Sequence, residues 1–217
     1  MTITPESVSA LLSSESQGDR IRGVNQLREL DKSIAYQLVQ TPIQDKNTRV
    51  RYAAVSLMDT LGDVDLAKSL EVLRNCLQDA EYDVQAAAAD ALGGLKLKES
   101  LPELIDLYHK TEEWLLKLSI VAALGSMEDL RALPLFAESL ESSVELIKMT
   151  TVQAIGDLCD PAGVDLLAKV VAEPDTQIRF RVAEALGKIG GEQAQALLKQ
   201  LANDADPQVA EQAQAFL

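Results

Sequence analysis

Residues 147–156 read IKMTTVQAIG, residues 178–187 read IRFRVAEALG, and related phrases recur along most of the chain. Each phrase starts with an apolar residue, and the next residue is usually basic or polar. The six phrases start at Val50, Val84, Leu116, Ile147, Ile178 and Val209, and they recur with a period of about 31 residues. A nearly constant period of this length indicates a repeat protein in which every copy is one supersecondary unit.

Each phrase is predicted to be an α-helix. Apolar or small residues lie at positions 0, +4, +7, +8 and +11 of the copies, which is the spacing of one helical face rather than of a strand. A second apolar run at helical spacing precedes each phrase, for example Leu70, Leu73 and Leu77. The short polar links between the runs supply Asp, Ser, Thr and Asn for N-caps and Pro for first turns.

The repeating unit is therefore a helical hairpin, and a degenerate first copy is expected at Ile21, close to one period before Val50. One hairpin cannot bury its apolar face alone, so neighbouring hairpins must stack into a shared core. We expect an all-α protein, an α-solenoid of HEAT-like hairpins, in a single domain over residues 1–217. The seven predicted hairpins cover 5–30, 32–61, 64–95, 99–126, 129–157, 161–188 and 191–217.

The charge of the chain disfavours nucleic acid as a partner. The formal net charge is −14, and residues 63–217 hold thirteen basic against twenty-seven acidic side chains. Such a surface repels a phosphate backbone. No apolar run approaches the roughly 20 residues of a membrane span, and no basic segment followed by a hydrophobic stretch opens the chain. A soluble, cytoplasmic protein without a membrane span is expected.

Residue types do not define a catalytic site, and the question of enzyme activity stays open. His109 is expected near a helix end. Because it is the only histidine, paired His-Glu metal ligands are excluded and no metal site is predicted. Cys76 and Cys159 have no neighbouring ligands and suit a reducing compartment. Neither catalytic residues nor an intrinsic cofactor can be assigned.

Arginines near the start of the chain are candidate binding residues. Arg20 and Arg22 are assigned the same repeat phase as Arg49 and Arg51, so stacking is expected to align them as a ridge. In one interpretation, the basic residues bond the acidic turn of a neighbouring copy and are structural. In the other, they form an anion site, because a guanidinium binds a carboxylate through two parallel hydrogen bonds.

Two aromatic residues complete the candidate binding set. Tyr52 begins a row at position +2 of successive copies, which continues with Ala86, Leu118, Met149 and Phe180. This row either packs against the adjacent hairpin or forms an exposed apolar groove. Trp114, the only tryptophan, starts a central helix and is either a partner anchor or a turn-packing residue.

The repeats with Ile-Arg or Val-Arg followed by Ala-Leu-Gly resemble the short HEAT-like repeats of phycobilisome lyases. The opening segments DRIRGVNQLR (19–28) and DKNTRVRYAAVS (45–56) resemble more narrowly the cyanobacterial lyase-like proteins implicated in phycobilisome degradation. The resemblance implies a cytosolic cyanobacterial protein that binds phycobiliproteins, with a linear tetrapyrrole of the phycocyanobilin type as ligand. It also implies two alternatives: a bilin lyase or chaperone subunit that attaches chromophore, and a regulator that binds an A-type iron-sulfur scaffold protein.

Overall fold

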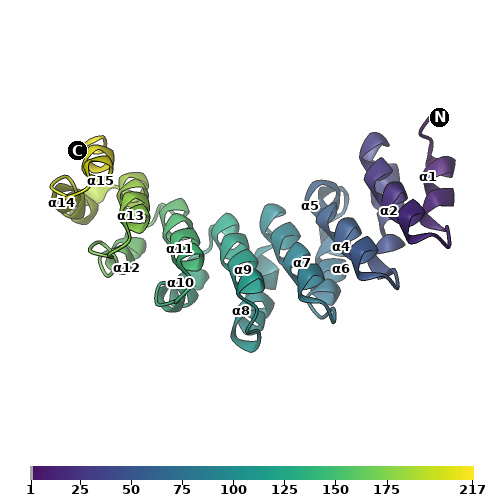
Figure 1. Ribbon diagram of the computed structural model, residues 1–217, viewed down its shortest axis with the longest axis horizontal. Coiled ribbons are helices and arrows are strands. Elements are labelled where there is room, and N and C mark those ends of the chain that lie inside the picture. Colours follow the sequence, from purple (N-terminus) through teal and green to yellow (C-terminus); the bar gives the residue numbers. More distant parts are fainter. Residues whose placement is uncertain (1) are drawn as a thin grey trace. The chain divides into compact units, whose positions relative to one another are not determined.

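The computed structural model describes residues 2–217, and within that range the regular structure is entirely helical, with no strand. The contacts form two compact units, one ending at Leu107 and the other beginning at Tyr108. Both units are built from successive helix pairs, so the predicted all-α solenoid of helical hairpins is confirmed (Figure 1).

The first unit contains three complete helix pairs, extended by short 3₁₀ segments. Its helices are α1 (Pro5–Leu12), α2 (Gln17–Gln26), η1 (Leu27–Glu29), α3 (Lys32–Val39), η2 (Pro42–Gln44), α4 (Thr48–Ser56), α5 (Met58–Leu61), η3 (Gly62–Val64), α6 (Leu66–Cys76), α7 (Tyr82–Gly94) and η4 (Lys98–Ser100). The second helices of its pairs pack in sequence, α2 on α4 and α4 on α7. The unit boundary lies within α8 (Leu101–Lys110).

The second unit repeats this arrangement. Its helices are α9 (Trp114–Met127), η5 (Leu130–Ala132), α10 (Leu133–Ser139), α11 (Glu145–Asp157), η6 (Pro161–Gly163), α12 (Val164–Leu167), α13 (Thr176–Ile189), α14 (Gly191–Leu201) and α15 (Pro207–Gln214). The helices α9, α11, α13 and α15 lie side by side, each packed against the next (Figure 1). Helices that are one repeat period apart in sequence therefore present equivalent faces.

The repeat phrases supply the core, as their spacing predicts. The residue at position 0 is at most 1% exposed in all six phrases: Val50, Val84, Leu116, Ile147, Ile178 and Val209. The Leu or Ile at position +8 is also fully buried in α9, α11 and α13. Apolar burial is the dominant favourable term in folding, so these two rows stabilise each helix against its neighbour.

The polar links cap the helices that follow them. The Asn47 side chain accepts the N–H of Arg49 at 3.0 Å, and Asp175 Oδ1 accepts those of Gln177 and Ile178 at 2.7 and 3.1 Å. Ser16, Asp65 and Asp206 cap α2, α6 and α15 in the same way. These side chains satisfy N–H groups that have no partner within the helix, and they fix where each helix begins.

Candidate functional site

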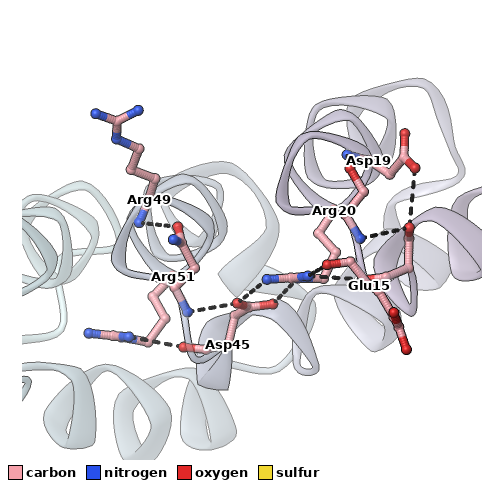
Figure 2. Close-up of polar contacts among 9 residues, drawn as sticks. Glu15, Asp19, Arg20, Asp45, Arg49 and Arg51 are labelled. Carbon is pink, nitrogen blue, oxygen red and sulfur yellow. Dashed lines mark hydrogen bonds and ion pairs between the residues drawn. The ribbon is translucent and has the colours of Figure 1, made fainter.

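Arg20 on α2 joins the loop before α2 to the loop before α4. Its Nε and Nη2 donate to the two carboxylate oxygens of Asp45 at 2.6 and 3.0 Å, and its Nη1 donates to the carbonyls of Ser14 and Glu15 at 3.0 and 2.9 Å (Figure 2). Only 7% of the Arg20 side chain and 10% of that of Asp45 are exposed. The contact is a bidentate, nearly buried ion pair between neighbouring repeats.

The same contact recurs in later repeats. Arg51 donates to both carboxylate oxygens of Asp79 at 2.7 and 2.8 Å and to the carbonyl of Asp45 at 2.9 Å. Arg179 donates to both oxygens of Asp204 at 2.7 and 3.0 Å. Each of the three aspartates also accepts a backbone N–H two residues further on. We call the three Arg-Asp pairs the arginine ladder.

The ladder is modified in the middle of the chain. Gln85 on α7 donates to the carbonyl of Asp79 at 2.7 Å, and Lys148 on α11 pairs with Glu173 at 2.6 Å. Lys117 on α9 lies over the Tyr108 ring, with its Nζ 5.0 Å from the ring centroid. Gln85 thus bonds its own loop and Lys148 the following loop, as the structural interpretation of the basic positions predicts, whereas Lys117 contacts a ring of the preceding helix α8.

The predicted register of the first repeat is wrong. Arg20 and Arg51 make equivalent contacts, whereas the predicted register places Arg22 in the same position as Arg51. The ridge of four arginines does not form, because Arg20 and Arg51 turn into the loops while Arg49 points away from Arg51 and Asp45 (Figure 2). Arg22 and Arg49 are exposed.

The exposed candidates of the first unit lie on two packed helices. Arg49 and Tyr52 are three residues apart on α4 and are both exposed, so they share one helical face. Arg22 lies on α2, which packs against α4; it is 60% exposed and pairs with Asp19 at 2.6 Å. Binding by Arg20, Arg22, Arg49, Arg51 or Tyr52 stays a prediction, and only Arg22, Arg49 and Tyr52 are accessible for it.

Trp114 is the first residue of α9 and 44% exposed. Tyr108, close to it in sequence, is buried and accepts a hydrogen bond from Ser139 at 3.1 Å. His109 Nε2 lies 2.9 Å from a carboxylate oxygen of Glu138, so the histidine links α8 to α10. Whether Trp114 anchors a partner stays a prediction.

The cysteines have different environments. Burial, followed by the charge of Asp79, raises the pKa of the Cys76 thiol to about 11, which leaves it protonated at neutral pH. Cys159 is exposed, with a left-handed backbone. No group of three or more His, Cys, Asp or Glu side chains within residues 2–217 is arranged to hold a metal ion.

Leu115 and Leu146 are exposed apolar residues that the repeat pattern did not single out. These residues precede the buried position 0 of α9 and α11, and 44% and 45% of their surfaces are exposed. The equivalent residues of other copies are polar, including Arg49 and Asp83. An apolar residue at a position that is otherwise polar was the signal that could have identified them.

The ladder gives the stability a defined pH dependence. The hydrogen bond from Arg51 lowers the pKa of Asp79, and that from Arg179 lowers the pKa of Asp204. The folded pKa values lie below the unfolded value of about 3.9, so the stabilisation is present above that pH and is lost as the pH falls through the folded values. We expect the urea midpoint to fall steeply below about pH 4, and less steeply in Asp79→Asn. Equal acid sensitivity of the two proteins would contradict this assignment.

Paired helices stacked through a repeated ion pair define a helical-repeat protein. The family model of HEAT repeats matches residues 70–156 and 143–217. The chain belongs to the HEAT-repeat family. Among the helices in the described range, none has the length and apolar character needed to cross a membrane.

Solved structures share this fold over the whole chain, whereas no curated protein matches the sequence. A chain of the complex of CpcE and CpcF of phycocyanin lyase from Nostoc sp. PCC7120 has 23% identity and a TM-score of 0.64, with 100% of this chain and 96% of that chain covered. The archaeal HEAT-like repeats protein from Thermococcus onnurineus NA1 has 15% identity and a TM-score of 0.63, with the same coverage. An engineered protein has 17% identity and a TM-score of 0.66, with 99% of this chain and 67% of that chain covered.

Proposed function

We propose that this protein binds phycobiliproteins and handles their linear tetrapyrrole during phycobilisome breakdown, in the cytoplasm of a cyanobacterium. The observation that carries the proposal is the end-to-end likeness in fold to a chain of the phycocyanin lyase complex, with a TM-score of 0.64. The resemblance of the opening segments 19–28 and 45–56 to lyase-like proteins supports the same function.

The exposed residues of the first unit suit such a ligand. A bilin carries two propionates and an extended apolar conjugated system. The exposed guanidinium of Arg49 can bind a carboxylate through two hydrogen bonds, and the Tyr52 ring on the same face of α4 can cover apolar surface. Arg22, on the adjacent helix α2, offers a second cation. In this proposal Arg20 and Arg51 hold the loops in place and do not touch the ligand.

Spectroscopy with phycocyanobilin and with phycocyanin tests the proposal. We expect the purified protein to change the visible absorbance of one or both in a saturable way. An unchanged spectrum, together with no association with phycocyanin in sedimentation, would reject the function.

The accessible site is tested separately with Arg49→Ala combined with Tyr52→Ala. We expect about tenfold weaker bilin binding, because a hydrogen-bonded charge contact and an aromatic surface are lost, and an unchanged Tm. Arg28→Ala, which removes another exposed arginine of the same unit, is the matched control. If both variants bind as the wild type does while the wild type still perturbs the spectrum, the site assignment is wrong and the function stands.

A further inference from the structure

The second unit has an apolar surface on its parallel helices that its own residues leave uncovered. It consists of Trp114, Leu115 and Leu118 on α9, Leu146 and Met149 on α11, and Phe180 on α13. Trp114, Leu115 and Leu146 are 44%, 44% and 45% exposed, and the other three are half-buried. These residues lie outside the buried rows at positions 0 and +8, and each keeps part of its surface exposed to solvent.

The surface is organised in rows that run across the helices. Leu115 and Leu146 are equivalent residues of successive repeats, as are Leu118, Met149 and Phe180. The helices α9, α11 and α13 pack side by side (Figure 1), and packed helices lie about 8–10 Å apart. Side chains along a row are therefore about one helix spacing apart.

This spacing matches a partner helix laid across the rows. Residues seven apart on an α-helix lie on the same face and about 10.5 Å apart along its axis. Three such residues would meet α9, α11 and α13 in turn, so a helix of about 15 residues spans the surface. Partly exposed apolar side chains gathered on neighbouring helices mark protein interaction sites.

The charges at the edge of the apolar surface indicate which kind of partner helix binds there. The exposed carboxylates of Glu112, Glu113 and Glu145 lie at the edge formed by the amino-terminal ends of α9 and α11. Residues 108–217 contain nine basic and seventeen acidic side chains, so two copies of this unit repel each other through their net charge. A partner with basic side chains on one flank is attracted there instead.

We propose that the apolar surface of α9, α11 and α13 binds an amphipathic helix of another protein, with apolar residues on one face and lysine or arginine along one flank. This interaction surface goes beyond the proposed bilin site, whose residues lie in the first unit. It gives Trp114 the role of an edge anchor.

Peptide binding followed by Trp114 fluorescence tests the proposal, because Trp114 is the only tryptophan of the chain. The probe is a synthetic helical peptide of about five turns without tryptophan, with leucines on one face and lysines along one flank. A second peptide has glutamate in place of each lysine. We expect the lysine peptide to shift the Trp114 emission to shorter wavelength in a saturable way and the glutamate peptide to bind at least about tenfold more weakly.

Two variants with the same substitution separate the surface from general effects. Leu146→Asp alters the surface, whereas Leu130→Asp alters a leucine of η5, in the same unit, that is 47% exposed. We expect Leu146→Asp to bind the peptide about tenfold more weakly than the wild type. Leu130→Asp should bind it with the affinity of the wild type, and the two variants should have the same Tm. Absent binding, equal affinity for the two peptides, or equal losses in the two variants would overturn the proposal. A wild-type dimer in sedimentation that Leu146→Asp dissociates would assign the surface to a second copy instead.

Discussion

Replacing Arg20 by alanine is expected to lower the free energy of unfolding by about 3–5 kcal/mol, the usual cost of breaking a buried ion pair by removing one partner. The substitution leaves the Asp45 carboxylate, 10% exposed, without its guanidinium. It also removes the donors to the carbonyls of Ser14 and Glu15. These contacts connect the loop before α2 with the loop before α4, so two neighbouring repeats lose a shared restraint.

Arg22→Ala is the matched control for this prediction. Arg22 lies on the same helix and also pairs with an aspartate, but its side chain is 60% exposed. Its loss should change the stability by no more than about 0.5 kcal/mol. Urea unfolding followed by far-UV circular dichroism measures both variants, and a double-mutant cycle with Asp45→Asn isolates the pair. Similar effects of Arg20→Ala and Arg22→Ala would show that the ladder contributes little to stability.

The repeat architecture could be predicted because burial imposes the same spacing on every copy. Val84, Ile147 and Ile178 must face a neighbouring hairpin, and this requirement is visible in one sequence as a nearly constant period. The first repeat was misaligned because the equivalent of Val50 is Asp19, a polar residue, while Ile21 two positions later looked like the start of a copy. Terminal repeats have only one neighbour and tolerate such departures.

The candidate site was less predictable, because the sequence does not say which way a side chain turns. Arg49 and Arg51 are two residues apart on a helix and therefore point in different directions: Arg51 bonds Asp79, and Arg49 faces solvent. The partner of Arg20 lies 25 residues away in the next link, a distance in sequence that carries no local signal. The structural interpretation predicted contacts between basic residues and neighbouring acidic turns, but only the structure shows that Arg20, Arg51 and Arg179 make them.

Replacing Gly156 by leucine is expected to lower the free energy of unfolding by about 3 kcal/mol, at the upper end of overpacking costs. A Cβ atom at Gly156 would lie 2.8 Å from the Cα and Cβ atoms of Ala185, closer than atoms of this kind approach. The obstacle is backbone, so α11 and α13 would have to move apart and their shared buried rows would loosen. A flexible side chain could have turned aside, whereas a neighbouring helix cannot.

Gly18→Leu separates this contact from the general effect of removing a glycine. Gly18 is exposed near the start of α2, and a Cβ atom there would meet only Ser16 Oγ, at 3.8 Å. Leucine favours a helix over glycine by up to about 1 kcal/mol, so this variant should be as stable as the wild type or slightly more stable. Urea unfolding of both variants, with Trp114 fluorescence as a reporter of the second unit for Gly156→Leu, gives the comparison. If Gly156→Leu is as stable as Gly18→Leu, α11 and α13 are not in backbone contact. That result would also contradict the close packing that aligns the apolar rows of these two helices.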